Sequence, residues 1–157
     1  MGLAKSKRGI IAPSFGGWQV GYLEGTLTNA QIKALRATPI TLVPAPGANK
    51  MLELVSLVLE LKAGTNALTE STANLAVKYT NGSGAQVSQT IESTGFIDQT
   101  VDTTTLGLPK IDPIAASSAS LNKALVLHNL GAGEIAGNAA ADATLKYKVS
   151  YRVHSNL

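Results

Sequence analysis

The residues that could carry out acid–base or metal chemistry are few and widely spaced in this chain. It has two histidines, His128 and His154, and no cysteine. A metal site needs several ligands, and a general base needs a partner group within hydrogen-bond reach. No cluster of histidine and carboxylate residues has the spacing of a ligand set. We therefore expect both histidines to be structural or to face solvent, and we expect no metal and no cofactor.

Two carboxylates, Asp98 and Asp102, are four residues apart and would share a face if their segment were helical. Paired carboxylates can hydrolyse glycosides or hold Ca²⁺. This pair lies among threonine and glutamine in "TGFIDQTVDTTT", without the bracketing aromatic residues that many sugar sites use. We expect them to be polar loop residues.

The glycine-rich stretch "NLGAGEIAGNAAADA" contains Gly131, Gly133 and Gly137. It has neither a dinucleotide fingerprint nor the Lys-Ser/Thr ending of a phosphate loop. It lies between two expected strands, so no helix N-terminus is available to hold a phosphate. A flexible loop at one end of the domain is the preferred interpretation, with a contact to a neighbouring molecule as the alternative. Nothing in the sequence supports an enzyme.

The net charge of +3 is located in one short segment. Lys5, Lys7 and Arg8 account for it, because removing these three from the 13 basic residues leaves 10, which match the 10 acidic ones. The chain is thus a neutral body with a short basic arm. A neutral body lacks the electrostatic field that attracts nucleic acid. We expect no specific nucleic-acid partner.

The positions of these residues depend on elements that the sequence pattern predicts. In "LTNAQIKALRATP", Thr28 and Gln31 have capping-box spacing and Pro39 disfavours helix at Thr38, so we expect a short helix. The strand "ITLV" follows from Ile40. Residues 51–62, "MLELVSLVLELK", have apolar side chains on both faces of a period-two pattern. They predict a long central strand covered on most of both faces, with a helix as the alternative.

Later strands have clearer patterns. "NLAVKYT", the turn "NGSG" and "AQVSQTI" predict a hairpin, and "NKALVLHNL" predicts a strand that is apolar on both faces. "TGFIDQTVDTTT" is ambiguous and could hold one helical turn. In "ATLKYKVSYRV", the side chains of Leu145, Tyr147 and Val149 alternate with Lys146 and Lys148, which predicts a strand with one face on the core.

These elements predict an all-β fold, a β-sandwich of about seven or eight strands of jelly-roll type with one short helix. Residues 1–22 form an expected N-terminal arm, and residues 23–157 form the sandwich domain. No stretch reaches the roughly 20 apolar residues that a membrane-spanning helix needs. The arm contains large apolar side chains that we expect to form a capsid or subunit interface: Ile10, Ile11, Phe15 and Trp18. The alternative is a frayed terminus packed on its own domain.

The chain resembles a group of small virion proteins of tailed bacteriophages, among them head decoration or cement proteins. The similar stretches are "GTLTNAQIKALRATPITLVPAPGANKMLELVSLVLELKAGT", "NLAVKYTNGSGAQVSQTIESTGFIDQT", "NKALVLHNLGAGEIAG" and "LKYKVSYRVH". The resemblance covers most of the chain beyond the arm, and no motif in it has diagnostic chemistry.

The resemblance implies a non-enzymatic protein on the outer surface of the capsid, assembled in the host cytoplasm. Its expected partners are the major capsid protein, whose neighbouring copies it would bridge, and itself, as a homodimer or homotrimer. Two alternatives remain open. One is a tail or receptor-binding component, and the other is a small icosahedral shell protein whose basic arm contacts nucleic acid.

Overall fold

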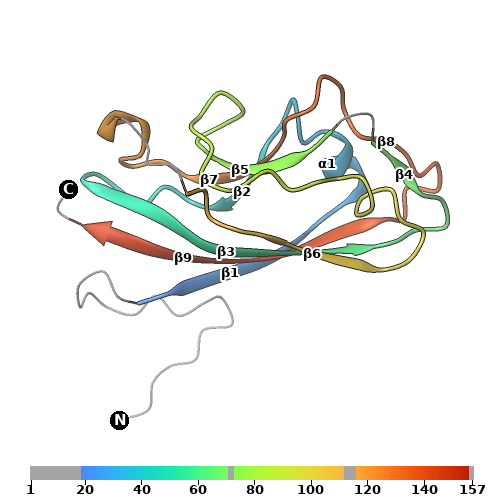
Figure 1. Cartoon of the computed structure of the whole chain (residues 1–157), viewed down its shortest axis with the longest axis horizontal. Coiled ribbons are helices and arrows are strands. Elements are labelled where there is room, and N and C mark those ends of the chain that lie inside the picture. Colours follow the sequence, from blue (N-terminus) through green and yellow to red (C-terminus); the bar gives the residue numbers. More distant parts are fainter. Residues whose placement is uncertain (1–18, 71–72, 112–115, 156–157) are drawn as a thin grey trace, which may run out of the picture.

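The structure is a computed structural model, and it describes residues 19–70, 73–111 and 116–155 (Figure 1). Strands dominate it, so the chain has an all-β fold with one short α-helix, as the sequence predicts. In chain order the elements are β1 (Gly21–Leu27), α1 (Asn29–Lys33), β2 (Ile40–Val43), β3 (Lys50–Lys62), β4 (Leu68–Thr69), β5 (Leu75–Tyr79), β6 (Thr103–Gly107), the 3₁₀ turn η1 (Ser117–Ala119), β7 (Leu125–Asn129), β8 (Ala136–Gly137) and β9 (Thr144–Ser155).

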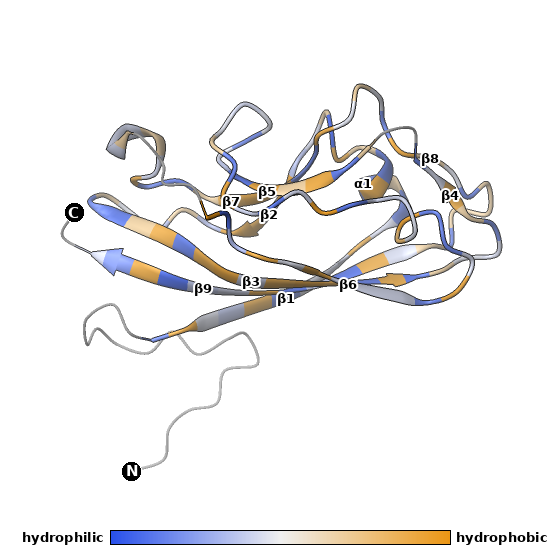
Figure 2. Cartoon of the chain, viewed as in Figure 1, coloured by the Kyte–Doolittle hydropathy of each residue, from blue (hydrophilic) through white to orange (hydrophobic). Residues whose placement is uncertain are grey.

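The strands form two main antiparallel sheets that lie in two layers (Figure 1). The larger sheet has the order β1-β9-β3-β6, and the smaller has the order β2-β7-β5. A two-stranded sheet, β4-β8, lies at one end. Leucine, valine and isoleucine side chains from both layers form one core cluster. Figure 2 shows that apolar and hydrophilic residues alternate along β9.

The apolar pattern of β3 is explained by a register shift rather than by burial of both faces. Pairing between β3 and β9 shifts between Leu54 and Ser56, which is the signature of a β-bulge. The bulge changes which alternate residues point inward. Five leucines therefore face the core and are fully or almost fully buried: Leu52, Leu54, Leu57, Leu59 and Leu61. The opposite face is half-buried, so one face of the strand lies on the core and the other is partly covered.

Strand β1 is an element that the sequence pattern did not predict. It begins at Gly21, so the last two residues assigned to the arm, Gly21 and Tyr22, pair with β9. Its alternation is hidden because two of its inward positions are glycines. The ring of Tyr147 covers Gly25 so closely that a Cβ there would lie 2.7 Å from a ring carbon. The tyrosine thus supplies the apolar surface that the glycine of an edge strand lacks.

Helix α1 begins as the sequence predicts. The side chain of Thr28 accepts from the backbone N–H of Gln31, and the side chain of Gln31 accepts from the N–H of Thr28 at 2.9 Å. This reciprocal capping satisfies two backbone donors that the helix leaves unpaired. Ile32 and Leu35 are fully buried, so the capping box fixes where the chain enters the core. None of the helices among the described residues is long and apolar enough to cross a membrane.

The predicted hairpin partner of β5 is irregular. Residues 85–91 run beside β5 through backbone hydrogen bonds, among them Val87 N to the Val77 carbonyl and Ile91 N to the Leu75 carbonyl. They form isolated bridges and no regular strand. The ambiguous segment after them contains a turn that buries Phe96 and Ile97, and then strand β6.

Candidate interaction surfaces

The arm residues that the sequence selects for an interface lie outside the described residues. Ile10, Ile11, Phe15 and Trp18 all belong to residues 1–18. Their role stays a prediction. The described residues, however, contain the surfaces on which an arm or another protein could bind.

Asp98 and Asp102 do not form a carboxylate pair. Asp98 accepts a hydrogen bond from the backbone N–H of Gly95 at 2.8 Å, as a turn residue does. Asp102 binds the ammonium group of Lys62 at 2.8 Å, and this hydrogen bond lowers the pKa of the carboxyl. The pKa of Lys62 rises to about 12 through its bonds to Asp102 and then Glu60. Both aspartates are therefore occupied by structural contacts.

The two histidines lie in different environments. His154, on β9, has its Nε2 atom 2.7 Å from one carboxylate oxygen of Glu53. The guanidinium group of Arg152 lies 3.3 Å from the other carboxylate oxygen of Glu53. His128, on β7, is 8% exposed, and its Nδ1 atom is buried without a hydrogen-bond partner. Burial, followed by the charges of nearby Lys78 and Arg36, lowers the pKa of His128. Within the described ranges, no group of three or more histidine or carboxylate residues could hold a metal ion.

The outer face of the four-stranded sheet carries basic and acidic side chains in register. Glu60 lies 4.0 Å from Lys146, and Glu24 lies 3.9 Å from Lys148. The ammonium group of Lys148 also lies over the ring of Tyr22, 5.4 Å from its centroid. Exposed pairs of this kind contribute only about 0–1 kcal/mol each. Their main effect is to neutralise the basic stripe of β9 within the chain, so this face offers no basic platform for nucleic acid.

The glycine-rich loop is anchored rather than flexible. Asn138, 1% exposed and with a φ of 43°, sits at its centre. Its side-chain carbonyl accepts from the amide of Asn29 at 2.7 Å and from the backbone N–H of Ala143 at 3.2 Å. Its amide donates to Asp142 at 2.9 Å and to the carbonyl of Asn66. This network ties the loop to helix α1 and to the loop after β3.

Asp142 extends the same network towards Thr65. The Thr65 hydroxyl donates to Asp142 at 2.6 Å, and the Thr65 backbone N–H donates at 2.9 Å. These bonds and the one from Asn138 lower the pKa of Asp142 to about 2. The loop end of the molecule is thus held by hydrogen bonds between segments far apart in the sequence. The number of glycines in this stretch had predicted a flexible loop instead.

Six large apolar side chains are exposed among the described residues, and three of them lie on or just after the edge strand β6; the other three are Val20, Tyr22 and Val101. Leu106 is 61% exposed, Leu108 is 51% exposed and Ile111 is 88% exposed. We call these three residues the edge strip. Exposed apolar side chains that lie close together on a protein surface mark interaction sites more often than isolated ones do.

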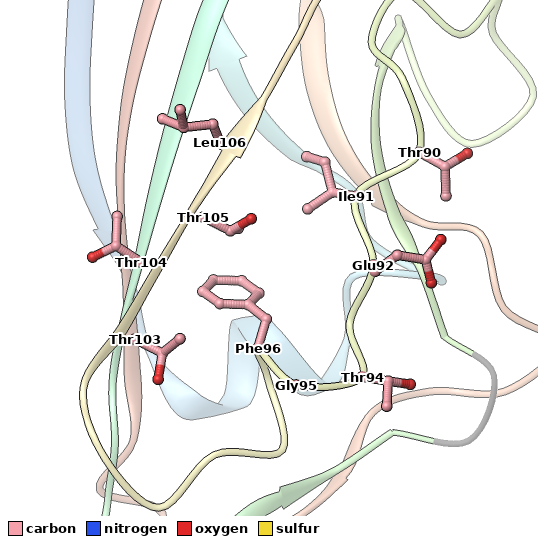
Figure 3. Close-up of a pocket in the computed structure, with 10 residues that line it drawn as sticks. All are labelled: Thr90, Ile91, Glu92, Thr94, Gly95, Phe96, Thr103, Thr104, Thr105 and Leu106. Carbon is pink, nitrogen blue, oxygen red and sulfur yellow. The ribbon is translucent and has the colours of Figure 1, made fainter.

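A hollow of about 330 Å³ lies between β6 and residues 90–96 (Figure 3). Thr105 points into it from β6, and the Phe96 ring lies below. Ile91 lines the other side. A second hollow of about 330 Å³ shares Thr90 with the first and extends to Ile111 of the edge strip. Both hollows are shallow and open, and no pair of catalytic groups lines either of them.

Comparisons with known proteins gave two distant structural similarities. Neither a protein-family model nor a curated protein matches the chain. A chain of the cyanophage Pam1 capsid asymmetric unit is 17% identical, with a TM-score of 0.43 over 97% of this chain and 96% of that chain. A chain of the capsid of Ralstonia phage GP4 is 14% identical, with a TM-score of 0.43 over 91% of this chain and 90% of that chain. A TM-score below 0.5 does not establish a shared fold.

Proposed function

We propose that the chain is a non-enzymatic structural protein of a bacteriophage virion. In this proposal it decorates the outer surface of the head and bridges neighbouring major capsid proteins. The phage assignment comes from the sequence resemblance stated above. The assignment to the structural class rests on the surfaces of the molecule.

The observation that carries the proposal is the distribution of exposed apolar and charged residues. The described residues hold a tightly packed core and a sheet face whose charges are paired within the chain. Three of their six exposed large apolar residues, Leu106, Leu108 and Ile111, lie on or just after β6, where Leu106 lines one shallow hollow and Ile111 lines a second. A small-molecule site is instead concave and brings a few polar groups together in an enclosed pocket. A folded domain with exposed apolar residues at the β6 edge suits a protein that acts through repeated contacts in an assembly.

We also propose that the fold is of the jelly-roll type, and the strand order supports this. In a jelly roll of eight strands, one sheet has the order 1-8-3-6 and the other has the order 2-7-4-5. We leave out the short strands β4 and β8 and count residues 85–91 as the fifth strand, so that β5 becomes the fourth strand and β9 the eighth. The larger sheet then has the order 1-8-3-6, and the smaller sheet has the order 2-7-4-5. The irregular pairing of that segment is the reason why only three strands are assigned to the smaller sheet.

The direct test is co-sedimentation of the purified chain with expanded and unexpanded heads of the parent phage at two salt concentrations. The expected result is saturable binding to expanded heads at a fixed ratio to the capsid protein. Absence of binding to both head forms would refute the decoration role. Formation of empty shells by the purified chain would refute it in favour of a shell protein.

The same assay tests whether the arm takes part in attachment. Deletion of residues 2–19 is expected to leave the folded domain intact, because β1 begins at Gly21, and to weaken binding to heads. Far-UV circular dichroism and a urea titration check the folding of the shortened chain. Equal binding of the full-length and shortened proteins would show that the arm is not the clamp.

A further inference from the structure

Strand β6 is an edge strand, and the residues directly after it are paired, with the N–H of Gln89 bound to the Leu108 carbonyl and the N–H of Lys110 bound to the Val87 carbonyl. It is the last strand in the order β1-β9-β3-β6, and its sequence "TTTLG" contains no charged residue and no proline. Exposed edges present unpaired N–H and C=O groups, which proteins commonly protect with lysine, proline or a covering loop. The other edge strand, β1, carries the exposed Glu24. The two edges therefore differ, and β6 is the one suited to accept an additional strand.

The first hollow lies directly beside this edge. Thr105 of β6 points into it, and Ile91 and Phe96 supply apolar surface (Figure 3). A strand added to β6 would make backbone hydrogen bonds to the edge and place alternate side chains against this surface. Five residues of β6 offer about 17 Å of edge at 3.3 Å per residue. The site therefore fits a short extended segment with apolar side chains.

Carboxylates around the hollow have hydrogen-bond partners but no cations. Glu92 lines the hollow and accepts from the side chain of Asn74 at 2.9 Å. Glu70 accepts from Thr94 at 2.6 Å, and Thr94 also lines the hollow. Neither glutamate forms an ion pair with a described residue, although the glutamates of the larger sheet do. A ligand with basic residues next to an apolar run would complement this site.

The chain contains one segment with that composition. Residues 1–18 lie outside the described residues and include Lys5, Lys7 and Arg8, followed by the apolar run "GIIA" at positions 9–12. We propose that this arm, from a second copy of the chain, adds to β6 as a strand. In this arrangement Ile10 and Ala12 face the hollow and Ile11 points to the opposite face, because successive side chains of a strand alternate. The basic residues approach Glu70 and Glu92. The proposal goes beyond the head-binding function because it concerns contacts between copies and needs no capsid.

The direction of β1 favours the arm of a second copy over the arm of the same chain. Through the register of the sheet, Gly21 of β1 lies across from Leu54 of β3. The hollow lies beside the part of β6 that pairs with Glu60 of β3, which is further towards the other end of the sheet. Traced back towards the N-terminus, β1 runs away from the hollow. An arm of the same chain would have to reverse its direction and pass over the charged sheet face. An arm of 18 residues reaches up to about 60 Å when extended, which is enough to span two copies.

Each copy then has one arm and one acceptor edge, so the contact is heterologous. Contacts of this type close into a ring or continue as an open array. This arrangement would link copies of the protein through β6, including Leu106, and would leave Leu108 and Ile111 of the edge strip available for another partner.

The absence of cysteine allows a direct test in the full-length protein. One variant carries Ala12→Cys in the arm, and a second carries Thr105→Cys in the hollow. The two are mixed under mild oxidation, and disulfide-linked heterodimers are measured on a non-reducing gel. Thr26→Cys, exposed on the opposite edge strand β1, replaces Thr105→Cys in the control. We expect several-fold more heterodimer with Thr105→Cys than with Thr26→Cys.

Three results would overturn the proposal. Equal yields from the two acceptor positions would mean random collision. A disulfide that forms within a doubly substituted chain, with no heterodimer in the mixture, would assign the hollow to the arm of the same chain. Efficient homodimers of Thr105→Cys without an arm cysteine would indicate that two β6 edges pair with each other.

A second measurement does not depend on disulfide formation. Thr105→Arg fills the hollow with a long charged side chain, and Thr26→Arg makes the same change on β1. Sedimentation velocity of the full-length variants is expected to show loss of self-association for Thr105→Arg only. Self-association of both variants at the wild-type level would overturn the proposal.

Discussion

The hydrogen-bond network around Asn138 makes a quantitative prediction about stability. Substitution of Asn138 by alanine removes the acceptor for the amide of Asn29 and for the backbone N–H of Ala143. Both of these residues are at least 95% buried, so water cannot replace the lost partner without a rearrangement. Each orphaned buried group costs about 1–3 kcal/mol. The two groups together predict a loss of about 2–6 kcal/mol.

The backbone conformation adds to this cost. Asn138 has a φ of 43°, a left-handed conformation that costs alanine more than asparagine. The added strain is about 1–2 kcal/mol. We therefore expect Asn138→Ala to lower the free energy of unfolding by about 3 kcal/mol or more, a large part of the 5–15 kcal/mol typical of a domain.

Two further variants separate these contributions. Asn138→Gly relieves the backbone strain but still removes the side-chain hydrogen bonds, so it should be about 1 kcal/mol less destabilising than Asn138→Ala. Asn122→Ala is the matched control because Asn122 has a φ of 52° but is exposed, and its side chain accepts one bond, from the N–H of Gly47 at 3.0 Å. This control should lose only about 1–2 kcal/mol.

Urea denaturation followed by far-UV circular dichroism measures all three free energies. The m-value must stay constant for the comparison to be valid, because a changed slope reports a changed denatured or native state. If Asn138→Ala were no more destabilising than Asn122→Ala, the buried network would contribute nothing beyond the backbone. The reasoning from unsatisfied buried groups would then be refuted.

Three further predictions concern single ionisable or hydrogen-bonding groups. Hydrogen bonds, first the one from the Thr65 hydroxyl, lower the pKa of Asp142 from 3.8 to about 2. The stability that this carboxylate contributes is therefore present above about pH 4 and is lost as pH falls towards 2. Between pH 4 and pH 2, the melting temperature should fall more steeply for the wild type than for Asp142→Asn. Tyr79 donates a hydrogen bond to the Leu52 carbonyl between the layers, so Tyr79→Phe should cost about 1 kcal/mol in a urea titration, and no change would contradict that role. Burial lowers the pKa of His128, so the folded state loses stability as pH falls below 6.5, and His128→Gln should reduce the drop in melting temperature between pH 7.5 and 5.5.

The sequence predicts those elements whose pattern is local and regular. The capping box of Thr28 and Gln31 and the alternation of β9 depend on neighbours in the sequence, and the structure confirms both. Strand β3 was predicted correctly, but the change of its inward-facing residues at a bulge was not. A bulge between Leu54 and Ser56 depends on the partner strand, and period-two counting cannot detect a change of phase.

The elements and surfaces that the sequence did not predict depend on residues far apart in the chain. Gly25 breaks the alternation of β1, and the ring of Tyr147, more than a hundred residues later, covers that position. The anchoring of the glycine-rich loop likewise depends on Asn29. The threonine-rich stretch of β6 had no apolar pattern because it lies at an edge, with Thr105 facing a hollow instead of a filled core.

These cases share a physical cause that also bears on function. Residues that contact a distant partner within the fold have patterns that look weak by themselves, and the same holds for residues that contact another molecule. Strand β6 has high β-propensity from its threonines but no covering partner among the described residues. The arm has apolar residues but no core of its own in the sequence pattern. Each supplies what the other lacks, which is why the contact between copies follows from the composition of both segments.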